Sequence, residues 1–352
     1  MKDLVETIKS LSNAIPNPSL SFMEVCGTHT MAIWRHGLRS VLPERIRLLS
    51  GPGCPVCVTS PAQIDAAIAL AREPETIIVT FGDMVRVPGT DSSLEREWAA
   101  GADVRVLYSP LGALELAKAH PTKRVIFIAV GFETTAPLTA SLALQSRRDG
   151  VRNLYIFSAH KIIPPAMEAL LAGGDVQIDG FLCPGHVSTV IGSQAYEFIA
   201  QRFGKPCVVA GFEPADILLV IKMLLQQIVE GRKAVEIEYT RCVKPEGNPK
   251  ARRCTDDVFV PADAGWRGLG MIPKSGLRLR AEFFSLDAES HFGVKLRHVE
   301  EPGGCSCGAV LRGVMTPPEC PLFSTTCTPE TPIGPCMVSS EGACAAFYRY
   351  GR

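Results

Sequence analysis

The chain has 352 residues, of which 46% are hydrophobic, and its 36 basic and 36 acidic side chains give a formal net charge of zero. This balance provides no basic surface for nucleic acid or for an anionic membrane, so we expect neither as a partner, and the length predicts two or three domains. Residues 1–6 lack the apolar core of a signal peptide, and no run of about 18 apolar residues predicts a membrane span, so we expect a cytoplasmic protein.

The first motif along the chain reads Cys-Gly-Thr-His-Thr at residues 26–30 and precedes a helix expected over residues 31–38. If Cys26 and His29 both lie near the first turn of this helix, they point the same way and bind one soft or borderline metal ion. Two alternatives stay open: His29 acts as the base for a Cys26 nucleophile, or the motif is an ordinary capped helix start.

A pair of cysteines follows the first predicted strand. Cys54 and Cys57 are separated by Pro55 and Val56, and two thiols at this spacing can cycle between dithiol and disulfide. Pro55 restricts the loop between them. The pair is also consistent with half of a metal site, or with a tight turn that holds two cysteines by chance.

From about residue 45 to residue 230, short apolar runs alternate with amphipathic segments. This alternation predicts an α/β protein with parallel sheets covered on both faces. We expect two small parallel-sheet domains that face a cleft, with a single seven-stranded sheet as the alternative. The expected strands are 46–49, 76–81, 104–108, 125–130, 154–157, 180–183 and 207–210. The expected helices are 61–71, 111–119, 136–145, 165–171, 190–202 and 214–229.

Several of these strands end in polar or glycine-rich turns. The carboxyl ends of parallel strands are where open α/β sheets bind ligands, so the turns together predict at least one functional cleft. Each turn taken alone is also explained as a strand-to-helix connection. The turns are 50–54, 82–83, 131–135, 158–161, 184–186 and 211–214.

We expect three domains. The first, residues 1–123, carries Cys26, His29 and the paired thiols; the second is residues 124–231; and the third, residues 232–352, is an irregular domain that binds a metal cluster. In this last domain we expect a loop over the basic segment 244–253 and a helix near residues 339–348.

Six of the thirteen cysteines lie in the last 48 residues. In a long chain without a signal peptide, clustered cysteines indicate metal ligands or redox thiols rather than disulfides. An iron–sulfur cluster needs four converging thiolates, whereas zinc sites usually contain Cys-x-x-Cys knuckles, which this segment lacks. Outside the segment, Cys183 and Cys207 lie in apolar strands and are expected in the core, and Cys242 and Cys254 receive no role. The six tail cysteines are Cys305, Cys307, Cys320, Cys327, Cys336 and Cys344.

Five stretches of the chain resemble the HypD family of hydrogenase maturation factors, in the same order and over essentially the whole length. The family's cluster ligands are four cysteines separated by fourteen, six and sixteen residues. The four cysteines that satisfy this spacing are Cys305, Cys320, Cys327 and Cys344. The resemblance, rather than composition, makes Cys307 and Cys336 neighbours instead of ligands. The similar stretches are 26–30, 51–57, 131–137, 184–188 and 339–344.

The resemblance implies a redox-active assembly scaffold rather than a free-standing enzyme. On it the iron of [NiFe]-hydrogenase would receive cyanide and carbon monoxide, with a small chaperone, HypC, sharing the iron and HypE delivering cyanide. Cys26 would bind this iron, with His29 beside it. Cys54 and Cys57 would be the redox pair, supplied with electrons through a [4Fe-4S] cluster. Glu341, one helical turn from a cluster ligand, would link the cluster region to the cleft.

General chemistry agrees with these expectations. Low-valent iron that carries cyanide and carbon monoxide prefers soft ligands such as thiolates. Release of cyanide from a thiocyanate-type donor needs electrons, and a dithiol gives two.

Two other functions stay open. A cluster-linked thiol–disulfide oxidoreductase would use the same cysteines without requiring Cys26 or His29, so disulfide reduction by a Cys26→Ala variant separates it from the scaffold. A non-catalytic module with structural zinc is separated from both by metal analysis.

Overall fold

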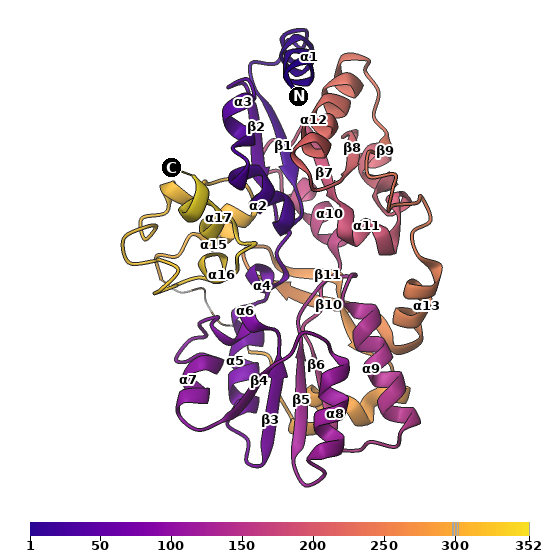
Figure 1. Cartoon of the computed structure of the whole chain (residues 1–352), viewed down its shortest axis with the longest axis vertical. Helices are drawn as coiled ribbons and strands as arrows, with labels where there is room; N and C mark the ends of the chain where they lie inside the picture. Colours follow the sequence, from indigo (N-terminus) through magenta and orange to yellow (C-terminus); the bar gives the residue numbers. More distant parts are fainter. Residues whose placement is uncertain (298, 300, 302, 352) are drawn as a thin grey trace.

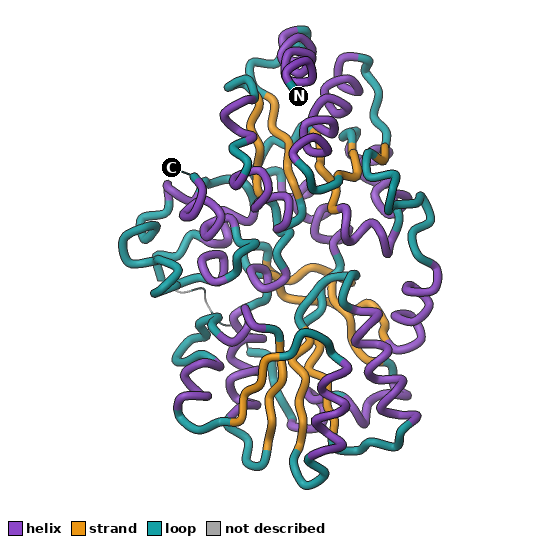
Figure 2. Tube along the Cα trace, in the orientation of Figure 1, coloured by secondary structure: helices purple, strands orange, loops and turns teal. Residues whose placement is uncertain are grey.

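The structure is a computed structural model that describes residues 1–297, 299, 301 and 303–351 (Figures 1 and 2). It contains two parallel β-sheets flanked by helices, one antiparallel hairpin, and a C-terminal region of short helices and loops. The predicted α/β class with two parallel-sheet units is therefore confirmed. No helix in the described ranges is long and apolar enough to cross a membrane.

The five-stranded sheet occupies the upper half of Figure 1. Three of its strands are buried along their whole length because apolar residues occupy both of their faces. They are β1 (Leu20–Glu24), β7 (Gly180–Pro184) and β8 (Cys207–Ala210). α1 (Lys2–Asn13) and α12 (Pro214–Val229) pack on one face, where apolar residues of α12 recur at helical spacing and share a core with the strands. The parallel order is β2 (Ile46–Ser50), β1 (Leu20–Glu24), β7 (Gly180–Pro184), β8 (Cys207–Ala210) and β9 (Val235–Ile237).

The four-stranded sheet lies below it in the same view. Successive side chains of β3 (Thr76–Thr80) point to opposite faces of the sheet and pack into two different cores. Ile77 and Val79 pack with α8 and α9, whereas Ile78 belongs to the core that includes α5. The parallel order is β4 (Asp103–Val106), β3 (Thr76–Thr80), β5 (Arg124–Ala129) and β6 (Leu154–Ser158). The three helices are α5 (Pro61–Ala71), α8 (Leu111–Ala119) and α9 (Ala136–Arg148).

Each sheet takes strands from both of the predicted α/β segments. β1 and β2 precede residue 123 but share a sheet with β7 and β8, while β3 and β4 share the other with β5 and β6. The predicted boundary at residues 123–124 therefore does not separate the two units. Apolar runs identify strands along the chain, but the order of strands in a sheet depends on contacts between distant segments.

An antiparallel hairpin lies between the two sheets (Figure 1). It consists of β10 (Phe259–Trp266) and β11 (Gly270–Leu279) and is missing from the sequence-based prediction, because Pro261 and Gly265 weaken the strand pattern. α13 (Pro249–Val258) occupies half of the basic segment that was expected to be a loop. The Asn248 side chain caps this helix by accepting from two backbone N–H groups of its first turn.

Several predicted helices have different bounds, and two of these differences change the local structure. α2 (Gly27–Arg35) begins before residue 31, with Cys26 as its N-cap. The helix expected over 190–202 is interrupted at Gly192, where φ is +80° and an added Cβ would lie 2.1 Å from the carbonyl oxygen of Pro245. The segment consists of α11 (Gly185–Ile191), a 3-10 turn (Ser193–Tyr196) and a π-helical turn (Ile199–Phe203).

The C-terminal region packs against the loops that follow β1 and β2. α16 (Pro335–Val338) contacts α4 (Pro55–Val58), and α17 (Ala343–Tyr350) contacts α2. The remaining helices are α3 (Leu38–Val41), α6 (Gly82–Val85), α7 (Leu94–Ala99), α10 (Ile163–Gly173), α14 (Ala288–Phe292) and α15 (Cys307–Leu311), with 3-10 turns at Ala281–Leu286 and Pro317–Glu319.

Candidate functional site

The Cys26 loop and the Cys54–Cys57 loop lie against each other. They follow β1 and β2, which are neighbouring parallel strands, so both loops leave the same edge of the sheet. The N–H of Gly27 donates to the carbonyl of Gly53 (3.0 Å). A Cβ added to Gly53 would lie 2.2 Å from the backbone nitrogen of Cys26. Only glycine therefore permits this approach of the two loops.

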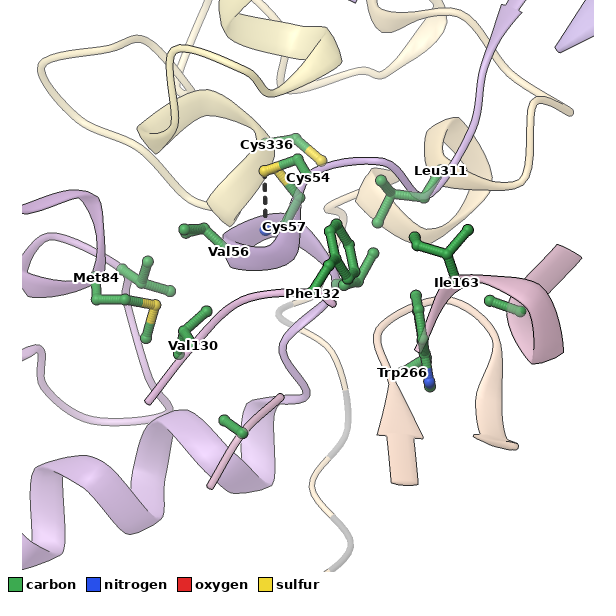
Figure 3. Close-up of a cluster of buried hydrophobic side chains, with 14 of the residues drawn as sticks. Cys54, Val56, Cys57, Met84, Val130, Phe132, Ile163, Trp266, Leu311 and Cys336 are labelled. Atoms are coloured by element: carbon green, nitrogen blue, oxygen red, sulfur yellow. Dashed lines mark hydrogen bonds between the residues drawn. A yellow bond between two sulfur atoms is a disulfide. The ribbon is translucent and has the colours of Figure 1, made fainter. Parts of the chain in front are cut away.

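Cys54 and Cys57 form a disulfide at the start of α4. The sulfur of Cys54 accepts from the N–H of Cys57 (3.2 Å), and Pro55 occupies the first position of the helix, where its missing N–H costs nothing. Both cysteines are buried, and Figure 3 shows them with Cys336 in one cluster of buried side chains. The Cys57 sulfur lies 3.9 Å from the carbonyl oxygen of Pro335, immediately before Cys336.

A cavity of about 660 Å³ lies where the two parallel sheets direct the carboxyl ends of their strands toward each other. Its walls include Cys26 after β1 and His186 after β7 on one side, and residues after β3 and β5 on the other. Pro55 and Val56 line it as well, so the disulfide lies directly behind its wall. The residues contributed by the four-stranded sheet include Phe81, Asp83, Gly131, Phe132 and Thr134.

The Cys26 thiol is held in a buried and electronegative position. Its pKa is raised to about 12, mainly by burial and also by the nearby carboxylate of Glu341, although the backbone N–H groups of His29 and Thr28 act in the opposite direction. The sulfur is therefore protonated at neutral pH. A cation bound at this sulfur would displace the proton, as is usual for thiolate ligands.

Glu24 supports Cys26 from within the sheet, and sequence reasoning overlooked it. Its Oε2 accepts from the N–H of Cys26 (3.1 Å), and its Oε1 accepts from the hydroxyl of Thr30. Burial raises the pKa of Glu24 to about 8, although these hydrogen bonds lower it. An acid at the end of a mostly apolar strand, two residues before a cysteine, was the available signal.

The His29 ring points away from the cavity. Its Nε2 donates to the carbonyl of Gly211 (3.0 Å), and the ring stacks on Phe212 at a centroid distance of 4.8 Å. Burial lowers the pKa of His29 to about 4, so the ring is neutral. The backbone N–H of His29 is directed at Cys26, whereas its ring contacts Gly211 and Phe212 and does not line the cavity. His186, which also stacks on Phe212 (3.9 Å), is the histidine that lines the cavity.

Residues 339–341 connect the C-terminal region to both walls of the cavity. The hydroxyl of Thr28 donates to Oε1 of Glu341 (2.7 Å), and the hydroxyl of Ser339 donates to Oδ2 of Asp83 (2.8 Å). Glu341 precedes α17 and is not part of the helix that was expected to contain it. Its contact with Gly27 is so close that a Cβ there would lie 2.4 Å from the Glu341 Cβ.

The tail cysteines line one small cavity in the C-terminal region. Four of them are the set that the family spacing selects, and the remaining two, Cys307 and Cys336, lie side by side with their sulfurs 2.7 Å apart. Burial raises the pKa of the Cys327 thiol, and the N–H of Ile333, which donates to this sulfur (3.3 Å), acts against that rise. Four thiols around one cavity, with an N–H directed at one sulfur, fit the donor set of an iron–sulfur cluster. The four are Cys305, Cys320, Cys327 and Cys344.

The other cysteines lie apart from these sites. Cys183 and Cys207 are fully buried in β7 and β8, as expected for core residues. Cys242 is exposed, and Cys254 contacts the hydroxyl of Ser141 (3.5 Å). These four cysteines do not line either of the two cavities described above.

Comparison with known proteins agrees with the arrangement of these motifs. The family described as HypD, hydrogenase formation hypA family, matches residues 1–351. The hydrogenase maturation factor HypD of Escherichia coli is 47% identical over 351 residues, which cover 99% of this chain and 94% of the relative. HypD2 of Bradyrhizobium diazoefficiens is 47% identical over 349 residues, covering 97% and 92%. A putative hydrogenase expression/formation protein of Methanocaldococcus jannaschii is 44% identical over 352 residues, covering 100% and 97%. The chain therefore belongs to the HypD family and is a hydrogenase maturation factor.

Proposed function

We propose that this chain is a cytoplasmic scaffold on which the iron of [NiFe]-hydrogenase receives its cyanide and carbon monoxide ligands. The observation that carries the proposal is the meeting of the Cys26 loop and the Cys54–Cys57 loop at one cavity between two sheets. A metal-binding thiol and a redox pair at the same place suit a reaction in which a ligand is released by reduction and captured by a metal.

The iron is the substrate, and Cys26 is the residue of this chain that binds it. A thiolate is a soft ligand and suits low-valent iron that carries cyanide and carbon monoxide. One thiolate does not complete the coordination of iron, so further ligands come from a partner. A HypC-type small chaperone that shares the iron meets this requirement. Glu24 fixes the backbone of Cys26, and Thr28 and Glu341 close the wall beside it.

The Cys54–Cys57 pair, in its reduced form, supplies the electrons for cyanide release. A HypE-type partner presents a thiocyanate, R–S–CN, at the cavity. The dithiol loses two electrons and two protons and forms its disulfide, the S–C bond of the donor breaks, and the products are R–SH and cyanide with one proton. The cyanide is released next to the iron on Cys26 because the two loops are in contact.

The tail thiols Cys305, Cys320, Cys327 and Cys344 would hold a [4Fe-4S] cluster. When bound, such a cluster supplies electrons one at a time. Cys336 lies on the α4 side of the thiol cavity, because α16 packs on α4 and the carbonyl of Pro335 lies near the sulfur of Cys57. The sulfur of Cys307 lies beside that of Cys336. Their dithiol reduces the Cys54–Cys57 disulfide by two exchanges. One thiolate attacks a sulfur of the disulfide, whose S–S bond breaks as a mixed disulfide forms. The second thiolate then attacks the mixed disulfide, so that Cys307 and Cys336 end as a disulfide and Cys54 and Cys57 as a dithiol that has taken both protons.

Anaerobic purification of the chain with a HypC-type chaperone tests the iron site. We expect infrared bands of iron-bound cyanide and carbon monoxide in the wild-type complex and their loss in Cys26→Ala, because no other cysteine lines the described part of the cavity. Cys242→Ala, which removes an exposed cysteine, is the matched control and retains the bands. Bands that persist unchanged in Cys26→Ala would exclude Cys26 as the iron ligand.

The same variant tests a cluster-linked thiol–disulfide oxidoreductase, which the closeness of the two thiol pairs also supports. If disulfide reduction were the function, Cys26→Ala would retain full activity toward a disulfide substrate and would support hydrogenase maturation. The scaffold predicts that maturation stops while exchange between the two thiol pairs continues.

A further inference from the structure

Arg267 lies in the turn of the β10–β11 hairpin and contacts the helix that carries the disulfide. Its backbone N–H donates to the carbonyl of Val58 (2.9 Å), and its Nε donates to the carbonyl of Thr59 (3.3 Å), both at the end of α4. The preceding Trp266 forms a β-bridge with Thr59. These bonds hold Arg267 against the end of α4, at the two residues that follow Cys57, and only 2% of Arg267 is exposed.

The same turn also contacts the helix that begins at Cys307. Gly268, with φ of +77°, packs so closely on α15 that an added Cβ would lie 2.3 Å from the Cα of Gly308. The N–H of Gly268 donates to Oε1 of Glu301 (2.7 Å), so this carboxylate bonds the backbone of the turn. The hairpin turn therefore lies between α4, which carries the disulfide, and α15, which begins at Cys307, and Arg267 places a cation at this junction.

The charge of Arg267 is not neutralised in the described part of the chain. None of the ion pairs among the described residues includes its guanidinium group. Its Nη1 is buried and has no hydrogen-bond partner there. A buried cation without a counter-charge is costly for folding. It is useful where negative charge develops during a reaction, because a fixed cation in a low-dielectric site stabilises an anion strongly.

We propose that Arg267 is the positioning residue for electron transfer between the two thiol pairs, and this inference rests on the function proposed above. In the exchange, the Cys307–Cys336 dithiol becomes a disulfide and the Cys54–Cys57 disulfide becomes a dithiol, so two electrons and two protons move between the pairs. Negative charge appears on sulfur at each step. The guanidinium stabilises this charge at the junction and makes the Cys54–Cys57 pair easier to reduce.

A redox titration of the full chain tests this role without any assay of hydrogenase assembly. The protein is equilibrated with dithiothreitol buffers, and alkylation followed by mass spectrometry gives the reduced fraction of Cys54 and Cys57. In Arg267→Gln we expect an equilibrium constant for reduction about tenfold smaller, equal to a midpoint about 30 mV more negative for a two-electron couple. In Arg267→Lys, which keeps the positive charge, we expect a midpoint close to that of the wild type.

The control is Arg278→Gln on the exposed part of β11, which leaves the midpoint unchanged. Arg267→Met is a second neutral variant. If either Arg267→Gln or Arg267→Met folds, its midpoint decides whether the charge of Arg267 favours reduction of the Cys54–Cys57 pair. A neutral variant with the wild-type midpoint, or Arg267→Lys with the same shift as Arg267→Gln, would overturn the role of the charge. A wild-type pair that never forms a reversible disulfide would instead overturn the proposed function itself.

Discussion

Glu24 illustrates how one buried side chain can define the position of a reactive thiol. Its two oxygens bind the N–H of Cys26 and the hydroxyl of Thr30, so the carboxyl group fixes the first turn of α2 relative to β1. Gly53, pressed against the same backbone nitrogen, fixes the second loop. Neither residue carries out chemistry, yet together they bring the Cys26 loop and the Cys54–Cys57 loop to the same cavity.

The raised pKa of Glu24 predicts a pH-dependent contribution to stability. Burial shifts it from 4.5 to about 8, so between these values the folded state keeps a proton that the unfolded state has lost. Unfolding then releases a proton, and the contribution of Glu24 to the free energy of unfolding falls as the pH rises.

Urea denaturation of the wild type and Glu24→Gln measures this contribution. His29 and other buried groups titrate in both proteins, so their effects cancel in the difference. We expect the wild type to lose stability relative to the variant between pH 4.5 and pH 8. A difference that stays constant across this range would contradict the buried, protonated state of Glu24.

At the scale of elements, the contact between the loops after β1 and β2 depends on Gly53. Gly53→Ala places a methyl group 2.2 Å from the nitrogen of Cys26, so the two loops must separate. We expect a loss of about 1–3 kcal/mol in the free energy of unfolding, as for other overpacked sites, and a loss of iron bound at Cys26. Gly173→Ala in α10 is the control, because no atom lies within 4 Å of its added methyl group. Equal stability and iron content in the two variants would refute the contact.

The elements themselves were largely predictable from sequence, because each predicted strand is a short apolar run. β5, β7 and β8 begin or end within one residue of their predicted bounds. β1 was overlooked because its five residues include Ser21 and Glu24, which interrupt the apolar run. Its absence explains the misplaced domain boundary, since β1 is the strand that joins β2 to β7.

The site was less predictable than the fold. The cysteine motifs identified Cys26, Cys54 and Cys57, but not that Gly53 brings their loops into contact. A histidine three residues after a cysteine was expected to face the same way, yet stacking on Phe212 and the bond to Gly211 direct the His29 ring into the protein. Such choices depend on the packing of residues from another strand, which local spacing does not encode.

For the whole molecule, residues 339–341 join the C-terminal region to both sheets. Ser339 bonds Asp83 beside the four-stranded sheet, and Glu341 bonds Thr28 beside the five-stranded sheet. The segment lies between Cys336 and Cys344, so the thiol-rich region and the cavity share one connection. In the proposed function, this arrangement would keep the region that supplies electrons in contact with the site that binds the iron.

Glu341→Ala tests this connection. A charged hydrogen bond of this kind contributes about 1.5–3 kcal/mol, so we expect the yield of cyanide-bearing iron to fall about tenfold or more. The visible absorption of the [4Fe-4S] cluster proposed for the tail should not change, because Glu341 does not line the thiol cavity. Glu115→Ala on the exposed face of α8 is the control and keeps the wild-type yield. Loss of the cluster absorption in Glu341→Ala would indicate a structural role in the tail instead.

The most direct test of the account is a single-turnover measurement of electrons and cyanide together. The reduced chain, loaded with iron and a HypC-type chaperone, is mixed with a HypE-type donor without external reductant. Infrared spectroscopy then counts cyanide on the iron, and mass spectrometry counts the Cys54–Cys57 disulfide. The account predicts one disulfide for each cyanide transferred. Cyanide that reaches the iron while the dithiol remains reduced would contradict it.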